Sequence, residues 1–178
     1  ADGIFRVDRE IYLDPDVFEA EMRSIFEADW IFLCHESQVR EPGDYFSAYL
    51  GRQPVFVHRQ EDGSLKGFLN ACSHRGAILT PTVRGKAKTL TCRFHGWTYK
   101  CNGECIRIKE QEGGYGEGFD RSVYDLQEIG AVASYKGFIF GSLSAEVLSL
   151  DDFLGESRSF IDFVANQSAA GLEVLPGS

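Results

Sequence analysis

The sequence contains no apolar run near the roughly 20 residues that a helix needs to cross a bilayer. Its first residues also lack the basic stretch followed by an apolar core that marks a secretory signal. Basic residues are scarce, since 18 Lys and Arg face 27 Asp and Glu and the net charge is −9. That balance opposes binding to nucleic acid. These absences predict a protein that has neither a membrane nor a nucleic acid as a partner.

Cysteine is also sparse. Five cysteines stand at irregular spacings, which does not match the framework of a disulfide-stapled domain. We therefore expect a reducing, cytoplasmic setting. The 178 residues, 43% of them hydrophobic and 25% charged, are enough for one compact core and too few for two full domains.

Short, regularly spaced segments with turn residues between them fill the middle of the chain. A helix is expected to begin at Pro15 after an Asp14 N-cap, because Phe18 and Met22 start an apolar stripe at helical spacing. A second helical pattern begins near Asp151, and either Asp151 or Asp152 is a candidate cap. The fold class expected is therefore mainly β, an antiparallel sandwich or small barrel with an N-terminal and a C-terminal helix. The expected strands cover residues 30–33, 45–50, 53–58, 65–69, 89–91, 98–100, 105–108, 131–135 and 138–141.

Two short motifs each combine a cysteine, a histidine and a glycine that follows them closely. Cys72 and His74 form C-x-H, and after 17 intervening residues Cys92 and His95 form C-x-x-H. A thiolate from each loop suits one metal ion, and an imidazole from each loop suits a second ion nearby. This donor set is typical of a Rieske [2Fe–2S] centre, in which two His replace two Cys on one iron. Cys72 and Cys92 would bind the inner iron, and His74 and His95 the outer one.

The same four residues could also form a structural zinc site, because Cys₂His₂ is a tetrahedral zinc ligand set. Zinc sites usually pair like ligands locally, as C-x₂₋₄-C and H-x₃₋₅-H, whereas each loop here pairs unlike ligands. Four unrelated core residues would not explain the glycine that both motifs share. The iron–sulfur interpretation is therefore favoured over both alternatives.

A hairpin signal and a glycine-rich segment lie outside these motifs. Residues 102–103, Asn-Gly, predict a two-residue turn that sets Cys101 opposite Glu104 and directs Cys105 to the other face. A disulfide between the two cysteines is therefore not expected. Residues 112–118 hold four glycines without the order of a phosphate-binding loop, which predicts a flexible loop.

The two motif segments, residues 70–77 and 91–99, resemble the Rieske domain of aromatic-ring-hydroxylating dioxygenase large (α) subunits. The resemblance continues through residues 133–142, 153–157 and 171–175, so that it covers nearly the whole chain. It is closest to the benzoate, toluate and anthranilate branch of that family.

The resemblance implies a division of the chain: a Rieske [2Fe–2S] domain over residues 42–150, with residues 1–41 packed against a catalytic domain that begins at 151–178. Members of the family hold a mononuclear non-haem iron in that catalytic domain through two His and one carboxylate. Here the remaining histidines, His35 and His58, both precede the cluster motifs. We therefore expect the mononuclear Fe(II) only in a full-length subunit, and this chain to be a piece of it.

The resemblance further implies an oxidoreductase role as the electron-relaying part of an aromatic-ring dioxygenase. A reductase or ferredoxin would supply electrons, and the catalytic domain of a neighbouring α subunit would receive them for O₂-dependent cis-dihydroxylation of an aromatic acid. A β subunit is a further expected partner. A free-standing Rieske ferredoxin is the alternative, disfavoured by the long segment before Cys72 and the helix after Asp151.

The charge of the chain is unevenly distributed. Residues 72–109 contain eight Lys or Arg and one acidic residue, so this segment carries +7 and the rest of the −9 chain carries −16. A basic surface around the ligand loops would attract an acidic partner and orient its approach.

Overall fold

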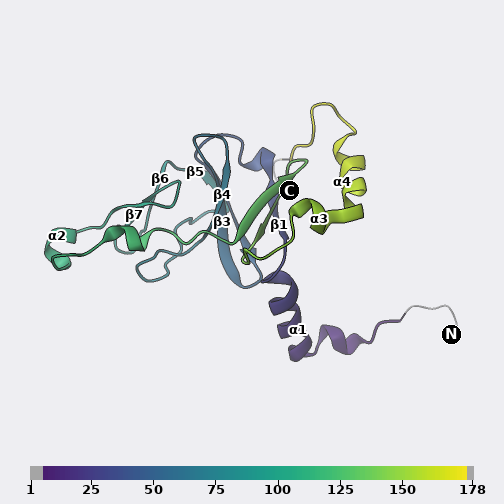
Figure 1. Cartoon of the computed structure of the whole chain (residues 1–178), viewed down its shortest axis with the longest axis horizontal. Coiled ribbons are helices and arrows are strands. Elements are labelled where there is room, and N and C mark those ends of the chain that lie inside the picture. Colours follow the sequence, from purple (N-terminus) through teal and green to yellow (C-terminus); the bar gives the residue numbers. More distant parts are fainter. Residues whose placement is uncertain (1–5, 176–178) are drawn as a thin grey trace.

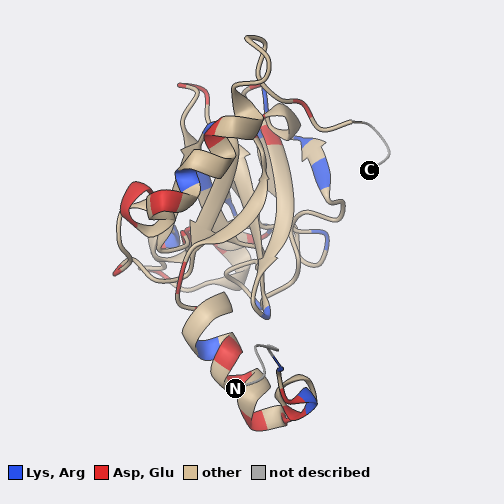
Figure 2. Ribbon diagram, turned by 90° about the vertical axis from the view of Figure 1, so that its right-hand side faces the viewer, with Lys and Arg blue, Asp and Glu red and all other residues tan. Residues whose placement is uncertain are grey.

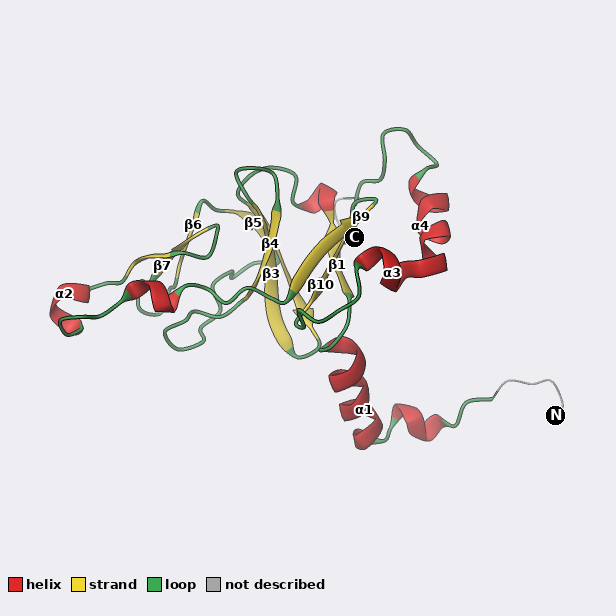
Figure 3. Ribbon diagram, in the orientation of Figure 1, coloured by secondary structure: helices red, strands yellow, loops and turns green. Residues whose placement is uncertain are grey.

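The computed structural model describes residues 6–175, and a body of β-strands lies at its centre with helices on either side (Figures 1 and 3). The strands form three antiparallel sheets. The first has the order β1 (Ile31–His35), β10 (Phe138–Ser142), β9 (Ala131–Tyr135). The second has the order β4 (Leu65–Leu69), β3 (Gln53–Arg59), β2 (Asp44–Leu50), β5 (Arg84–Lys86). The third has the order β6 (Thr89–Thr91), β7 (Thr98–Lys100), β8 (Cys105–Arg107). The expected mainly β, antiparallel fold is confirmed.

The helices lie mostly outside this body. α1 (Pro15–Glu21) begins as expected, with the Asp14 carboxylate accepting the Asp16 N–H at 2.8 Å, and continues as a wider π-helical turn. Among residues 6–175, no helix has the length and apolar composition needed to cross a membrane. The other α-helices are α2 (Gln111–Gly114), α3 (Leu150–Leu154) and α4 (Arg158–Ala165), and 3₁₀ turns cover Arg9–Tyr12, Glu36–Gln38, Arg121–Tyr124 and Gly155–Ser157.

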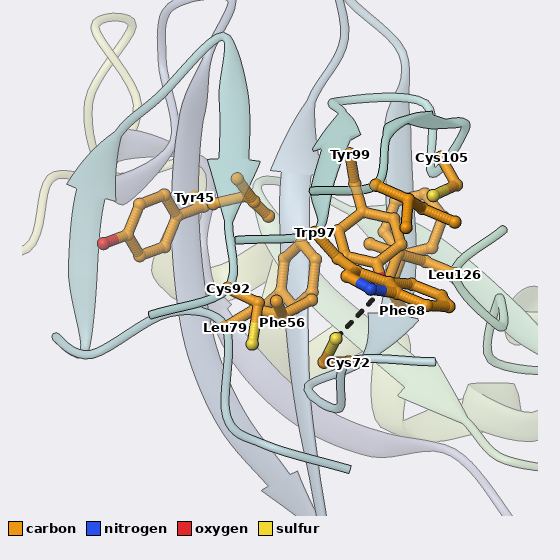
Figure 4. Packing of buried hydrophobic residues seen from close by; sticks show 12 residues of the cluster. Tyr45, Phe56, Phe68, Cys72, Leu79, Cys92, Trp97, Tyr99, Cys105 and Leu126 are labelled. Carbon is orange, nitrogen blue, oxygen red and sulfur yellow. Dashed lines mark hydrogen bonds between the residues drawn. The ribbon is translucent and has the colours of Figure 1, made fainter. Parts of the chain in front are cut away.

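Strand β3 is buried on both faces and separates two hydrophobic cores. Val55 and Val57 point to the core between the first and second sheets, which also contains Leu33 and Ile139. Phe56, one residue out of phase, points to the core between the second and third sheets. This second core includes Cys72 and Cys92 together with the aromatic side chains labelled in Figure 4. The sheets therefore hold both cysteine-bearing loops against one aromatic core.

A third, smaller core fixes the C-terminal part of the chain. Leu150 and Leu154 of α3 pack with Trp30 on the outer face of the first sheet. The Trp30 indole N–H donates to the Leu148 carbonyl at 2.9 Å. The helix is capped by Ser149, whose hydroxyl accepts the Asp152 N–H at 3.1 Å, and not by Asp151 or Asp152 as expected. The structure thus starts the helix one residue earlier than the sequence pattern indicates.

The hairpin between β7 and β8 differs from the prediction. The Lys100 N–H donates to the Glu104 carbonyl at 2.9 Å, and the Gly103 N–H returns to the Lys100 carbonyl at 3.0 Å. The turn therefore has three residues, and the expected pairing of Cys101 with Glu104 is wrong. The reason is Gly103, which takes φ +92° and lies so close to the Phe68 ring that a Cβ would meet it at 2.6 Å. All five cysteines are free thiols.

Candidate metal centre

The first ligand loop connects β4 to β5 and closes on itself through two hydrogen bonds. The Cys72 N–H donates to the Ala77 carbonyl at 2.8 Å, and the Gly76 N–H donates to the Cys72 carbonyl at 2.7 Å. Gly76 takes φ +71°, a left-handed conformation that side chains disfavour. The loop is anchored at its base by the buried Asn70 amide, which donates to the Thr80 hydroxyl at 2.6 Å.

The second ligand loop connects β6 to β7 and repeats the same arrangement. The Cys92 N–H donates to the Trp97 carbonyl at 2.7 Å, and the Gly96 N–H donates to the Cys92 carbonyl at 2.9 Å. Gly96 also takes φ +71°. The glycine that follows each motif is therefore explained by the conformation of the loop. Two loops with one backbone geometry present matching cysteines, as a shared metal cluster requires.

Both motif cysteines are almost completely buried, with 3% of Cys72 and 2% of Cys92 exposed. Their sulfur atoms lie at one edge of the aromatic core (Figure 4). The Tyr99 hydroxyl lies 3.1 Å from the Cys72 sulfur and accepts the Ser73 N–H at 3.2 Å, which directs its own proton toward the sulfur.

The protonation of Cys72 is governed by this burial. Desolvation raises the pKa of the Cys72 thiol. Hydrogen bonds from the Tyr99 hydroxyl and from the backbone N–H of His74 lower this pKa, and the neighbouring Cys92 thiol raises it. Burial likewise raises the pKa of the Tyr99 hydroxyl above its ordinary value, so Tyr99 keeps its proton as a donor. Iron binding would overcome the desolvation, because a bound cation deprotonates a coordinating thiol outright.

The two motif histidines come together next to these sulfur atoms. The rings of His74 and His95 lie 4.7 Å apart between centroids at an angle of 75°. Within residues 6–175, the buried Nδ1 atom of His74 has no hydrogen-bond partner. A buried polar atom without a partner is costly, and a metal ion bound there would satisfy it. Burial, then the charges of His95 and Arg75, lower the pKa of His74, which favours the neutral imidazole that binds metals.

The geometry distinguishes a two-iron cluster from a single zinc ion. In the described part of the chain, no group of three or more His, Cys, Asp or Glu side chains converges closely enough to hold one metal ion. A tetrahedral zinc site needs four ligands around one point. A Rieske cluster separates its two thiolate ligands from its two imidazoles by the width of the cluster. The buried thiols, the paired imidazoles and the unpartnered Nδ1 fit the cluster.

The other two histidines serve the fold elsewhere. His35 ends β1, and its Nδ1 lies 3.0 Å from the Ser37 hydroxyl. His58 is fully buried in β3, and its Nε2 lies 3.0 Å from the Ala87 carbonyl. Neither residue joins the motif histidines, as expected from the sequence.

Trp97 and Tyr99 are neighbours of the site that do not belong to its ligand pattern. Trp97 stacks on the His74 ring with a centroid distance of 4.8 Å and an angle of 10°. Trp97 immediately precedes β7 and Tyr99 lies within it, and both side chains are buried in the same aromatic core. The spacing H-G-W-x-Y is the signal that could have linked both residues to the site.

The basic side chains of residues 72–109 are all exposed, and Figure 2 shows where Lys and Arg lie on the ribbon. Arg75 and Arg93 belong to the two ligand loops. Lys88, just before β6, and Lys100, the last residue of β7, lie at the strand ends that are remote from the second ligand loop. The basic side chains that pair with a carboxylate are Lys86, Lys100 and Lys109. The positive charge is therefore spread over the third sheet, with only part of it at the loops.

An apolar side chain stands among these charges at the loops. Phe94, immediately before His95, is 68% exposed, and its ring lies 4.4 Å from the His95 ring. An open cavity of about 600 Å³ beside it is lined by both motif histidines together with Lys109 and Tyr115. The histidine edge of the site therefore faces an accessible surface.

Comparison with known proteins places this site in a family. The model of the Rieske [2Fe-2S] domain matches residues 29–135. The toluate 1,2-dioxygenase α subunit of Pseudomonas putida is 50% identical over 99% of this chain and 39% of its own length. The anthranilate 1,2-dioxygenase large subunit of Acinetobacter baylyi is 44% identical over 99% of this chain and 37% of its own length.

Solved structures agree with these matches. The naphthalene 1,2-dioxygenase from Rhodococcus sp., solved with bound indole, superposes with a TM-score of 0.85 at 39% identity. The match covers 91% of this chain and 37% of that one. The chain thus spans less than two-fifths of the length of the relatives described here. The expected resemblance to dioxygenase large subunits of the toluate and anthranilate branch is confirmed. Since the family model covers more than half of its residues, the chain belongs to the Rieske [2Fe–2S] domain family.

Proposed function

We propose that Cys72, His74, Cys92 and His95 hold the [2Fe–2S] cluster of this Rieske domain. Cys72 and Cys92 would bind the inner iron, and His74 and His95 the outer one. The observation that carries the proposal is the pair of loops with one hydrogen-bond pattern, which bring two buried thiols beside two facing imidazoles. The bound cluster would supply one-electron redox chemistry.

We further propose that the domain relays electrons within an aromatic-ring dioxygenase. The match to a toluate dioxygenase α subunit extends over 99% of this chain, helices included, which favours this role over a free-standing ferredoxin. The acceptor would be a mononuclear iron in the catalytic domain of a neighbouring α subunit, with a β subunit completing the assembly. Relatives named for toluate, anthranilate and 2-halobenzoate support an aromatic acid as the substrate class.

The division of the chain is also a proposal. Residues 42–150 would form the Rieske domain, and residues 1–41 and 151–178 would pack against the catalytic domain. Support comes from large apolar side chains that the described structure leaves exposed on both flanks. Phe18 of α1 is 48% exposed, and Phe160 and Phe163 of α4 are 76% and 73% exposed. Such faces are usually covered by another surface.

The electron donor would be an acidic reductase or ferredoxin that approaches the ligand loops. Arg75 and Arg93 supply charge beside the cluster, and the exposed Phe94 ring supplies an apolar centre. Aromatic and Arg side chains contribute most to small interfaces, while surrounding charges raise the association rate.

The relay is tested in a full-length subunit that contains this sequence. We expect His95→Ala to abolish repeated turnover of an aromatic acid with NADH and O₂ while the mononuclear iron content stays unchanged. His35→Ala is the matched control, because His35 lies at the end of β1, apart from the motif histidines. Undiminished turnover in the His95→Ala subunit would contradict the relay.

Donor docking is tested separately by stopped-flow reduction with an acidic [2Fe–2S] ferredoxin. The double change Arg75→Glu and Arg93→Glu is expected to slow association at least about tenfold at low salt, and added salt should narrow the difference. Arg84→Glu is the control, since Arg84 is exposed on β5, outside both ligand loops. A rate that responds neither to salt nor to the loop charges would refute the docking.

A further inference from the structure

Residues 111–124, which follow β8 and include the glycine-rich segment, carry three aromatic side chains that pack on one another. Tyr115 and Phe119 lie 4.4 Å apart between ring centroids, and Phe119 stacks on Tyr124 at 5.1 Å and 14°. Two of these rings also contact Trp97, Tyr124 at 5.3 Å and 90° and Tyr115 at 6.2 Å and 67°. We call Tyr115, Phe119 and Tyr124 the aromatic cover.

The aromatic cover reaches the proposed ligands through Trp97. Trp97 is 2% exposed, and its ring also stacks on that of His74. Offset and edge-to-face aromatic pairs contribute about 0.5–1.5 kcal/mol beyond the apolar area that they bury. The orientation of His74 therefore depends on Trp97, and that of Trp97 on the cover.

The cover also forms part of a wall around the histidine edge of the site. Tyr115 and Gly114 line the same cavity of about 600 Å³ as His74 and His95. Tyr115 is half-buried, although glycines surround it in the sequence. Tyr115 therefore forms part of the cavity wall next to Trp97, whose own ring is almost completely buried.

The backbone of this segment does little to hold it in place. In the described structure, the backbone hydrogen bonds of residues 111–122 join them only to one another, to Glu110 and to the turn that ends at Asp125. Gly113, Gly114 and Gly116 have open space where a Cβ would lie, and only Gly118 takes a left-handed φ, of +91°. Close packing therefore does not require glycine at most of these positions. Asp125, whose carboxylate accepts the Cys105 N–H at 2.7 Å, fixes the end of the segment, and the aromatic contacts hold the rest of it to the body of the domain.

We propose that the aromatic cover positions His74 through Trp97 and keeps water away from the face of the His74 ring on which Trp97 stacks. This inference rests on the proposed cluster ligands. A [2Fe–2S] cluster with two thiolates and two neutral imidazoles gains one negative charge on reduction. Because water stabilises that charge, a dry environment disfavours the reduced state. The cover therefore lowers the reduction potential.

The test compares single changes at Tyr124 in the cluster-loaded chain. Tyr124→Leu removes the edge-to-face contact with Trp97, and we expect it to favour reduction about tenfold, which is about +59 mV for one electron. Iron loss to a chelator should also be faster. Tyr124→Phe keeps the ring and should restore both the potential and the iron loss to those of the wild type. Tyr49→Leu is the control, since Tyr49 is 66% exposed on β2.

If the Tyr124→Leu protein has the reduction potential and the rate of iron loss of the wild type, the proposed role of the aromatic cover is wrong. If Tyr124→Leu does not fold, Tyr115→Leu replaces it with the same expected direction and the same criterion. The two proposals fail differently. A wild-type chain that holds no iron and sulfide refutes the cluster ligands, whereas a loaded wild type with unresponsive variants refutes only the cover.

Discussion

Replacing Tyr99 with phenylalanine removes one oxygen atom from the buried core beside Cys72. In the wild type, the hydroxyl donates toward the Cys72 sulfur over 3.1 Å and accepts the Ser73 N–H over 3.2 Å. Tyr99 is completely buried, so water cannot easily replace the lost hydroxyl. The change therefore acts on a proposed cluster ligand without changing the shape of the ring.

The magnitude follows from the charge on the sulfur. A hydrogen bond to a charged group contributes about 1.5–3 kcal/mol. The bond is stronger in the reduced state, which carries more negative charge, and hydrogen bonds to sulfur are an established influence on the potential. If about half of that energy depends on the redox state, roughly 0.75–1.5 kcal/mol of stabilisation of the reduced state is lost. At 59 mV for a tenfold change, the potential falls by about 33–65 mV.

Redox titration followed by EPR measures this shift directly. Tyr45→Phe is the matched control, because Tyr45 lies in the same core and its hydroxyl bonds to Thr82 at 2.8 Å, not to a cysteine. We expect Tyr45→Phe to keep the wild-type potential. Tyr99→Phe should also lose about 1–3 kcal/mol of stability, since the Ser73 N–H is left without its partner. Equal potentials in the two variants would refute the reasoning.

Two further predictions concern stability, measured by urea unfolding. Burial lowers the pKa of His58 from its ordinary 6.5, so the unfolded chain binds a proton there before the folded protein does. Stability should therefore fall as the pH drops below 6.5 and level off below the folded pKa, and His58→Gln should flatten this dependence; an unchanged slope would contradict it. Gly76→Ala should cost about 1–2 kcal/mol, because Gly76 has room for a Cβ but takes φ +71°. Gly113→Ala, with the same room and no left-handed φ, should cost nothing, and equal costs at the two positions would refute the conformational explanation.

Much of the fold could be predicted from the sequence because its strands are encoded locally. Residues 65–69 and 131–135, for example, form strands over the ranges that their pattern predicts. β5 was missed because Arg84-Gly85-Lys86 has no apolar residue. That strand forms because β2 offers it a free edge and because Gly85 leaves space for the Tyr45 ring, whose hydroxyl a Cβ would meet at 2.6 Å.

Part of the candidate site could likewise be predicted from the sequence, and part could not. The cysteine and histidine pairs stand within single loops, so their spacing alone indicates a metal centre. The flexible loop expected at residues 112–118 instead includes the end of α2 and part of the aromatic cover. The contacts of the aromatic cover with Trp97 join distant parts of the chain, and so does the hydrogen bond between Tyr99 and Cys72. Contacts of this kind depend on how the sheets pack, which local patterns do not determine.

Metal and sulfide analysis with EPR on anaerobically prepared protein tests the central claim most directly. We expect a [2Fe–2S] stoichiometry, two irons and two sulfides per chain, and on reduction the asymmetric signal of mixed nitrogen and sulfur ligation. That signal should disappear in His74→Ala and in His95→Ala and persist in His35→Ala. Zinc in place of iron, or an unchanged iron and sulfide content after both motif histidines are replaced, would contradict the account.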